Sequence, residues 1–577
     1  MGQTLVIAVL VGLLAVAPGL VVAAESPGAV GSLDGANGAV VGGGTSTVEQ
    51  ATTARPRIVG LYPNPPTEDD RGEFVTVALP PNANLSAYSL ADEQTRVPLS
   101  PRLTDANTTP TTLDSPEPSS DTVTFSTDPG LTAWLTNRTV APLSSALRLA
   151  NSGETVRLVH RGRVVDEVSY ESAPESERYE ARADSWEPLG ATDRAVVTAE
   201  DGTVGAFVLP DEPDRAVATL ADAERRVLLA GYTFTSSRVV DTLAAAIDRG
   251  VRVEVLVDGS PVGGMSSDGA AALSRLDRAG ATVRVFDGDR ARYRYHHPKY
   301  AVVDDTALVT TENWKPSGVG GASNRGWAVT TGQEAVVEGL VETYRADAGW
   351  VDTVRWGEYD PTVVESDPAT GSYPERFEAT RLPVDRTHLL VAPDNAARVV
   401  RERVLRAEES LAIKQVRIGD RGFGLLQDVL DAAARGVEVR ILLSGAWYVA
   451  EENEQFAAWL RDQAAAADLP LSVRVADPGG AFERIHAKGL LIDGEQALVG
   501  SLNWNDNAFR NNREVALLLE GEAVAGYFGS MFDADWDGES GSTGERDLPL
   551  GIALAVLAGV VVSILAAKHI AFEERST

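Results

Sequence analysis

The sequence predicts a multidomain protein in which an all-β domain is followed by a duplicated pair of α/β modules and one C-terminal transmembrane helix. Three observations lead to this prediction. Short runs of alternating hydrophobic and polar residues fill residues 57–185, a pattern of strands and helices occurs twice after residue 205, and residues 548–567 carry no charge. With 577 residues and 44% hydrophobic content, the chain is long enough for several such domains.

The chain is strongly acidic, poor in lysine and free of cysteine. The formal net charge is −32, and the 51 basic residues comprise five lysines and forty-six arginines. This acidic, Lys-poor composition resembles that of proteins from salt-loving archaea, where a Debye length of roughly 3 Å in molar salt makes the excess charge tolerable. The chain has no Cys, which excludes disulfides, thiolate metal sites and a Cys nucleophile.

The N-terminus reads as a secretion signal followed by a linker. Thr4 to Ala17 is almost wholly apolar and leads to the small residues "VVAAES", so we expect a signal peptide over residues 1–24. The positive segment that usually precedes such a core is missing, which leaves retention as an uncleaved anchor open. Residues 25–56, rich in Gly, Ala, Ser and Thr, predict a flexible linker.

The C-terminus predicts a membrane anchor. After a short linker over residues 539–547, residues 548–567 are long enough as a helix to cross a hydrocarbon core of about 30 Å. Lys568 and His569 follow directly, so the positive-inside rule places a tail of residues 568–577 in the cytoplasm. We therefore expect a single-pass protein of the cell membrane whose bulk is extracellular.

Residues 57–185 show strand-length runs such as "FVTVAL" and "VRLVHRGRVVDEVSY", separated by Pro, Asn and Gly. The opening Asn-Pro, the Glu-Phe-Val run, "LSAYSLAD" and the closing "VVDEVSY" resemble the lamin-tail domain. The resemblance implies an immunoglobulin-like sandwich and says little about function.

The two α/β modules are expected over residues 205–355 and 385–538. "RRVLLAGYTFTSSRVVDTLAAAIDRGVRVEVLVDG" and "ESLAIKQVRIGDRGFGLLQDVLDAAARGVEVRILLSG" share an apolar run, an amphipathic helix, an Arg-Gly-Val stop and a buried strand. Gly250 and Gly436 in the two stops lie 186 positions apart. Strands that alternate with helices predict a buried sheet in each module.

Each module ends with the pattern His-x-Lys-x-x-x-x-Asp. The residues are His297, Lys299 and Asp304 in the first module, and His486, Lys488 and Asp493 in the second. Side chains two apart on a strand share a face, so each His and its Lys should point into one site. The Asp-Asp and Asp-Gly pairs that end the motifs indicate turns, so each motif should be the first strand of a hairpin.

A site with two imidazoles and two ammonium groups suits a phosphodiester. Imidazole is a competent nucleophile toward phosphorus and a proton donor near neutral pH, and lysines neutralise charge on the phosphoryl oxygens. The alternative interpretations are a solvated His-Lys pair at a strand edge or a core histidine. Both are hard to reconcile with two copies at matched positions in so Lys-poor a chain.

These residues resemble the phospholipase D superfamily. The second copy matches its longer pattern through "HAKGLLID", "GSLNW" and "NNRE". The resemblance implies that both motifs form one active site, that one His attacks phosphorus to give a phosphohistidine, and that the other protonates the leaving alcohol. It implies no metal and no cofactor, and since one chain holds both motifs, no oligomer is required.

The resemblance also implies supporting roles. Asp304 and Asp493 would orient the site, Ser501 and Asn503 would bind phosphate, and Glu514 would hold His486. In the first copy "TTENWK" departs from the pattern, so Thr311 and Asn313 are the nearest equivalents, and Gly326 stands where the second copy has Glu514. His297 is thus expected to lack a carboxylate partner, which leaves open which His is the nucleophile.

Three further aromatic residues are expected to play no direct part. His296 should point away from His297 as a bystander, and Trp314 and Trp504 should pack the wall of the site.

The sequence indicates the substrate less directly than it indicates the type of reaction. The leading hypothesis is a lipid-acting phosphodiesterase or phosphatidyl-transferase at the outer cell surface, because the expected C-terminal helix tethers the modules to the membrane. An extracellular nuclease is the alternative, although a −32 chain without a basic tract is poorly suited to nucleic acid. A non-catalytic surface binding protein is the third interpretation.

Overall fold

The computed structural model describes residues 55–538, apart from residues 82, 100–121, 137, 139, 145, 287–290 and 367–368. The expected signal peptide, the expected membrane anchor and the cytoplasmic tail lie outside the described residues. Within the described part of the chain, no helix is long and apolar enough to cross a membrane.

The N-terminal domain is built from two β-sheets and one short helix. The sheets have the strand orders β10-β9-β1-β2-β5-β6 and β4-β3-β7-β8, and both contribute to one buried core. This confirms a domain made mainly of strands; its likeness to a lamin-tail domain stays a prediction. The elements are β1 (Arg57–Tyr62), β2 (Phe74–Ala78), β3 (Tyr88–Ala91), β4 (Arg96–Pro98), β5 (Thr122–Ser126), α1 (Pro129–Thr136), β6 (Val140–Pro142), β7 (Glu154–His160), β8 (Arg163–Tyr170), β9 (Glu177–Glu180) and β10 (Ser185–Pro188).

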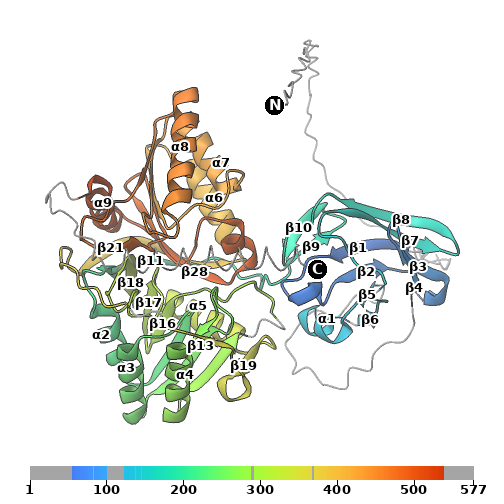
Figure 1. The fold of residues 1–577 in the computed structure, drawn as a ribbon, viewed down its shortest axis with the longest axis horizontal. Coiled ribbons are helices and arrows are strands. Elements are labelled where there is room, and N and C mark those ends of the chain that lie inside the picture. Colours follow the sequence, from blue (N-terminus) through green and yellow to red (C-terminus); the bar gives the residue numbers. More distant parts are fainter. Residues whose placement is uncertain are drawn as a thin grey trace, which may run out of the picture. The chain divides into compact units, whose positions relative to one another are not determined.

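The rest of the described chain forms two modules with the same strand order (Figure 1). From β11 outward the first module runs β11-β18-β17-β16-β12-β13-β15, and from β21 outward the second runs β21-β28-β27-β26-β22-β23-β24. The two long strands β11 and β21 pair antiparallel, so hydrogen bonds join the modules at this point. The duplication expected from the sequence is thus confirmed for these strands, and the first module adds β19 beside β15.

In the first module the bounds are β11 (Val197–Leu209), α2 (Arg215–Ala221), β12 (Arg226–Gly231), α3 (Ser237–Asp248), β13 (Arg252–Asp258), β14 (Met265–Ser266), α4 (Ser267–Ala279), β15 (Thr282–Phe286), β16 (Tyr300–Val303), β17 (Thr306–Thr310), β18 (Asn324–Thr331), α5 (Glu334–Ala348), β19 (Thr353–Arg355) and β20 (Val363–Val364). In the second they are β21 (Thr380–Ala392), α6 (Ala396–Arg406), β22 (Ser410–Gln415), α7 (Gly424–Ala434), β23 (Glu438–Leu443), α8 (Ala450–Ala467), β24 (Leu471–Val475), β25 (Arg484–Ile485), β26 (Gly489–Ile492), β27 (Gln496–Gly500), β28 (Glu514–Glu520) and α9 (Glu522–Asp537).

Local sequence explains where the outer helices begin and end. The Ser236 side chain accepts the N–H of Val239 at the start of α3, and Ser266 caps α4 in the same way. Gly250 and Gly436, in the two Arg-Gly-Val stops, have φ of 91° and 102°. This left-handed conformation favours glycine and turns the chain from each helix into the next parallel strand.

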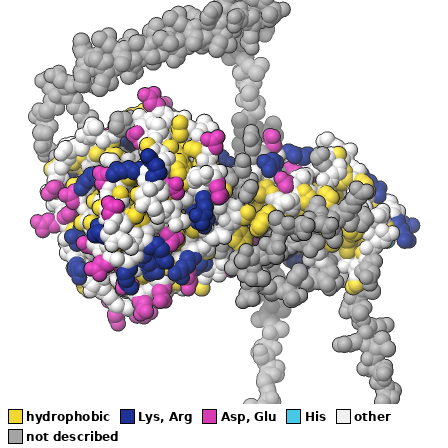
Figure 2. Space-filling model, turned by 90° about the horizontal axis from the view of Figure 1, so that it is seen from below, with side chains coloured by type: hydrophobic (Ala, Val, Ile, Leu, Met, Phe, Trp, Pro, Cys, Tyr) yellow, Lys and Arg dark blue, Asp and Glu magenta, His cyan; other side chains and the backbone are white. Residues whose placement is uncertain are grey.

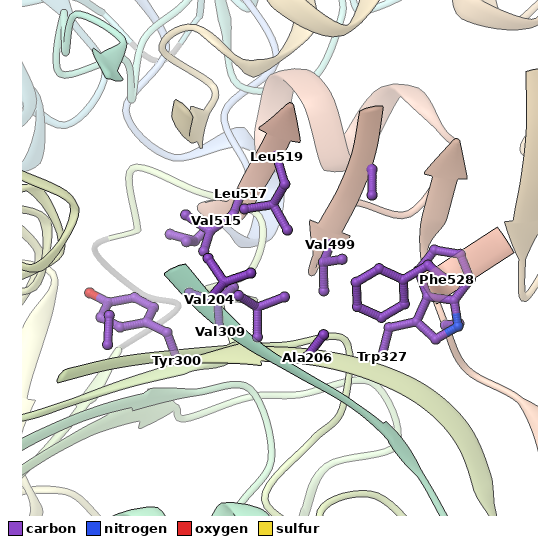
Figure 3. Packing of buried hydrophobic residues seen from close by; sticks show 14 of the residues in the cluster. Val204, Ala206, Tyr300, Val309, Trp327, Val499, Val515, Leu517, Leu519 and Phe528 are labelled. Atoms are coloured by element: carbon purple, nitrogen blue, oxygen red, sulfur yellow. The ribbon is translucent and has the colours of Figure 1, made fainter. Parts of the chain in front are cut away.

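The two modules share a central core. Residues from both sheets and from α5 and α9 form one buried cluster, and Figure 3 shows Trp327 of the first module beside Phe528 of the second. Their rings stack with centroids 4.7 Å apart. Gly489 permits this packing, because a Cβ there would lie 2.2 Å from the Trp327 ring. The central core therefore fixes the modules face to face.

The surface carries both signs of charge. On the face shown in Figure 2, acidic and basic side chains are interspersed across the described part of the chain.

Candidate active site

The His and Lys of each motif lie just before a strand hairpin, whereas we expected them on its first strand. β16 pairs with β17 and β26 pairs with β27, both antiparallel. The turns begin at Asp304 and Asp493, whose φ values of 51° and 53° lie in the left-handed region that Asp tolerates.

Backbone hydrogen bonds join each His segment to the other module. The N–H of His297 donates to the carbonyl of Arg513 over 2.9 Å, and the N–H of His486 donates to the carbonyl of Arg325 over 3.0 Å. Arg513 precedes Glu514, and Arg325 precedes Gly326. His297 therefore lies close to Glu514 of the second module, and His486 lies close to Gly326 of the first.

Glu514 consequently contacts His297, and our expectation that it holds His486 was wrong. Its Oε2 lies 2.8 Å from Nδ1 of His297, across the boundary between the modules. The expectation failed because it paired residues within one module, whereas the hydrogen bonds run between modules. His297, for which we expected no carboxylate, has a fully buried one.

His486 has a different carboxylate partner, Glu312 of the first module. The Glu312 Oε2 lies 3.2 Å from Nδ1 of His486, and its side chain is fully buried. Asn324 donates a hydrogen bond of 2.8 Å to the same oxygen. The sequence analysis missed Glu312, although a carboxylate where the second copy has Leu502 was a usable signal.

Gly326 makes room for Glu312. A Cβ at position 326 would lie 2.3 Å from Cγ and 2.4 Å from Oε1 of Glu312. The carboxylate of the first module is thus that of Glu312, which follows β17. Its side chain occupies the space that a side chain at position 326 would fill. Each imidazole has one carboxylate from the opposite module, although the two carboxylates come from different positions in the repeat.

Both motif lysines are buried beside their histidines. Lys299 Nζ donates to the carbonyl of His297 over 2.8 Å, and Lys488 Nζ donates to that of His486 over 2.7 Å. Lys488 also reaches the carbonyl of Thr311 in the first module, at 3.4 Å. Burial lowers the pKa of Lys488 to about 8 and that of Lys299 well below its usual value.

The two imidazoles are close enough to influence each other. Burial is the main cause that lowers the pKa of His297 well below 6.5, and Lys299, Lys488 and His486 lower it further. Burial also lowers the pKa of His486 to about 4, against the opposing effect of Glu312. Both rings are therefore neutral near pH 7, as a nucleophilic imidazole must be.

The two carboxylates differ in protonation. Burial raises the pKa of Glu514 to about 8, because Lys299, Ser501 and Asn512 offset it only in part. Burial also raises the pKa of Glu312, but His486, Lys488 and Asn324 outweigh it and leave the pKa below its usual value. Near neutral pH, Glu312 is therefore ionised and Glu514 holds a proton.

Asp304 and Asp493 lie at the far ends of the hairpins. Asp304 accepts the backbone N–H groups of residues 224–226 over 2.8–2.9 Å. Asp493 accepts those of residues 408–410. Each tethers its hairpin to the start of the neighbouring antiparallel strand, β12 or β22, and neither contacts an imidazole or lysine of the motifs. Any effect of these carboxylates on the site passes through the backbone.

The predicted phosphate-binding residues fall into two groups. The hydroxyls of Thr311 and Ser501 are buried and accept the backbone N–H of Trp327 and Val515, over 3.0 Å each. They hold the strands that lead to the opposite His segments. Asn313 Oδ1 is buried without a hydrogen-bond partner, and Asn503 is half-buried. The amides therefore remain the better candidates for contact with a substrate.

The three residues expected to play no direct part are all buried. Trp314 and Trp504 are fully buried in the outer cores of the two modules. His296 is buried, with Nε2 3.5 Å from Asp347, a carboxylate that also binds Arg513. Within the described residues, no group of three or more His, Asp or Glu side chains is placed to hold a metal ion.

A comparison with protein families agrees with this geometry. Residues 216–347 and 400–536 match the family model described as "Cardiolipin synthase, PLD-like domain". The matched segments coincide with the two modules, so each module is similar to a phospholipase D-like domain.

Individual relatives are distant. The DISARM protein DrmC of Bacillus paralicheniformis is 27% identical over 128 residues, which make up 22% of this chain and 50% of that protein. The chain thus matches about half the length of this relative. Similar solved structures include phosphatidylserine synthase of Haemophilus influenzae (14% identity, TM-score 0.43, 63% of this chain and 94% of that one) and polyphosphate kinase of Porphyromonas gingivalis (15%, 0.39, 62% and 55%). Nuc of Salmonella typhimurium, a phospholipase D family member, aligns over 27% of this chain and 98% of its own, at 20% identity and a TM-score of 0.24.

Proposed function

We propose that this protein is a phosphodiesterase or phosphatidyl-transferase of the phospholipase D type that acts on phospholipids through a covalent phosphohistidine. The observation that supports it most strongly is the crosswise pairing of two neutral imidazoles with buried carboxylates, beside two buried lysines. Ion pairs that only stabilise a fold would not need two matched groups of His, Lys and carboxylate in the same place.

The different protonation of the two carboxylates suggests a role for each histidine. Ionised Glu312 accepts a hydrogen bond from Nδ1–H of His486, which places the lone pair of the ring on Nε2, the nitrogen that attacks phosphorus. Protonated Glu514 donates to Nδ1 of His297, so the proton of that ring resides on Nε2 and is available to a leaving group. We therefore assign His486 as the nucleophile and His297 as the general acid.

The reaction then balances in two steps. His486 Nε2 forms a bond to phosphorus, and the bond from phosphorus to the leaving alcohol oxygen breaks. That oxygen takes the proton of His297 Nε2 while Glu514 passes its own proton to Nδ1, so the His297 ring stays neutral. Water or a second alcohol next gives its proton to His297 Nε2 while its oxygen attacks phosphorus and the bond to His486 breaks, and Nδ1 of His297 returns its proton to Glu514. Lys299 and Lys488 neutralise the non-bridging oxygens as charge develops on them.

The charge of the chain favours a lipid substrate over nucleic acid. The chain carries −32, and acidic and basic groups are interspersed on the face shown in Figure 2. A nuclease that follows a phosphate backbone needs a basic groove, and its affinity falls steeply with salt. The proposed location at the outer cell surface rests on the expected C-terminal helix.

The test offers two substrates side by side. Full-length protein in detergent and high salt receives phosphatidylglycerol or single-stranded DNA, with His297→Ala and His486→Ala as controls. We expect wild type to cleave the lipid and not the DNA, and we expect both variants to cleave neither. DNA cleavage in place of lipid cleavage would identify a nuclease, cleavage of neither would favour a binding protein, and activity in either variant would exclude the two-histidine mechanism.

The assignment of the nucleophile has a separate test. Wild-type protein and a His297→Ala variant are mixed with labelled substrate and quenched in alkali, in which phosphohistidine survives. We expect the label on His486 by peptide mapping. A label on His297 of the wild type would reverse the assignment.

A further inference from the structure

Exposed hydrophobic side chains of the two modules concentrate at two places. Among the described residues of the modules, the large hydrophobic side chains that are exposed are Val262, Val363, Val364, Leu405, Trp447 and Tyr448. Val262 and Trp447 are the most exposed, at 74% and 85%. All except Leu405 belong to two loops, residues 259–266 and 444–449, or to β20, which pairs with the first of them. We call these loops the rim loops.

The rim loops occupy equivalent positions in the repeat. The first follows β13 and leads into α4, whereas the second follows β23 and leads into α8. Because β13 and β23 hold the same place in the strand order, both loops leave the carboxyl ends of matched parallel strands. This is the edge of an α/β sheet at which ligands are usually bound.

Contacts tie both rim loops to the candidate active site. The Tyr232 hydroxyl accepts the N–H of Val262 over 2.5 Å, and the Tyr232 ring centroid lies 4.5 Å from that of His297. On the second loop, the Tyr448 ring centroid lies 5.9 Å from the guanidinium of Arg484. Arg484 precedes His486 by two residues. The first rim loop is therefore joined to His297 through Tyr232, and the second lies against the segment that leads to His486.

The chemistry of the rim loops fits the boundary of a lipid bilayer. Neither "GSPVGGMS" nor "SGAWYV" contains a charged residue. Trp and Tyr are the side chains favoured at membrane interfaces, because their rings have an apolar body and a polar edge. A loop that gripped nucleic acid through the same aromatic rings would itself carry lysine or arginine. The rim loops carry neither, although Arg484 of a neighbouring segment lies beside Tyr448.

We propose that the rim loops insert into the phospholipid bilayer that holds the substrate, with Val262 and Trp447 at their tips, and so place the two histidines at the lipid headgroups. This inference rests on the proposed lipid function and adds the surface through which that function is exercised. Since apolar insertion does not depend on opposite charges, binding persists in high salt.

The absence of Cys from the chain allows a local test of insertion. Val262→Cys and Trp447→Cys, each labelled with an environment-sensitive fluorophore in full-length protein, report from one rim loop each. Leu405→Cys is the matched control, because Leu405 is 42% exposed and lies near the end of α6, at the amino ends of the parallel strands. A local probe is unaffected by membrane anchoring elsewhere in the chain.

The probes are mixed with phosphatidylglycerol vesicles that contain nitroxide-labelled acyl chains, at low and at molar salt. We expect a blue shift and quenching at positions 262 and 447 under both conditions, and neither at position 405. Equal quenching at all three positions, or none at the rim, would overturn the proposal. A response to an oligodeoxythymidine in place of vesicles would assign the rim loops to nucleic acid instead.

Activity separates this inference from the proposed function. Trp447→Ala should hydrolyse vesicle lipid about tenfold more slowly than wild type, because membrane affinity follows buried apolar area, and should match wild type on a soluble short-chain phosphatidylglycerol. An equal rate on vesicles would overturn the inference while leaving the enzyme assignment intact. A wild type inactive on both lipids would remove the proposed function, and the probes would still report whether the rim inserts.

Discussion

Glu514 and His297 face each other across the boundary between the two modules, with Oε2 2.8 Å from Nδ1. This contact exists because the N–H of His297 donates to the carbonyl of Arg513, which brings the next residue along the chain to the imidazole. The candidate active site is therefore assembled from opposite halves of the repeat.

The first prediction concerns this pair. Glu514→Gln should lower kcat about 10- to 100-fold, in the range found for groups that orient a functional histidine. It should change the ring-nitrogen chemical shifts of His297 in NMR spectra and leave those of His486 unchanged. Glu451→Gln, at an exposed glutamate, is the control. A change confined to His486 would show that the pairing is wrong.

Acid should destabilise the protein through His486. Its pKa is about 4 in the folded protein, against 6.5 for an ordinary histidine. Between these values the unfolded chain binds more protons, so the free energy of unfolding should fall as pH falls from 6.5 to 4. His486→Asn removes this contribution, and urea unfolding across the range should show a shallower acid slope in the variant. Identical slopes would mean that the folded protein does not depress this pKa.

Asp493 should matter for stability and little for chemistry. Its carboxylate accepts the N–H of Glu409 and of Ser410 over 2.8 and 2.9 Å, away from both imidazoles. Asp493→Ala leaves these donors without their partner, which should cost about 1–3 kcal/mol in urea unfolding. The kcat of the folded variant should stay close to that of wild type. A large fall in kcat at unchanged stability would restore a direct role in the site.

The repeat and the His-Lys pairs could be predicted from the sequence because they depend on short-range pattern. Periodicity placed the helices and parallel strands, and two matched motifs pointed to one site. The partner of each histidine could not be predicted, since it depends on hydrogen bonds such as that from His486 to Arg325. No spacing along the chain encodes which module supplies each carboxylate.

The role of Gly326 also could not be predicted from the sequence, because it depends on a contact that only the fold creates. In the sequence it looked like the loss of a carboxylate, and it suggested a weaker first motif. In the structure it is the space through which Glu312 reaches His486. Likewise, the hydroxyls of Thr311 and Ser501 matched a phosphate-binding pattern, yet both accept backbone N–H groups.

The close packing of the two modules at Gly489 and Trp327 gives a further prediction. A Cβ at Gly489 would lie 2.2 Å from the Trp327 ring, so Gly489→Ala should overpack the central core and cost about 1–3 kcal/mol of stability. Gly526→Ala is the control, because a Cβ at this position in α9 meets nothing within 4 Å. Thermal unfolding should rank Gly489→Ala below wild type and Gly526→Ala at or above it. Equal melting temperatures for the two variants would contradict the close approach of the modules.

The last prediction exchanges the position of a carboxylate. Glu312→Leu installs the residue of the second copy and removes the partner of His486, so kcat should fall about 10- to 100-fold. Gly326→Glu alone should also impair the protein, because its side chain meets Glu312. Together the two changes recreate the arrangement of Leu502 and Glu514, and the double variant should recover part of the lost kcat.

This recovery distinguishes a chemical role from a structural one. If Glu312 only filled space, Leu would fill it as well and the single variant would stay active. If Glu312 acts on His486, a carboxylate delivered from position 326 should restore both kcat and the ring-nitrogen shifts of His486 in NMR spectra. A double variant that folds with the stability of wild type but stays as inactive as Glu312→Leu would contradict the equivalence of the two carboxylate positions.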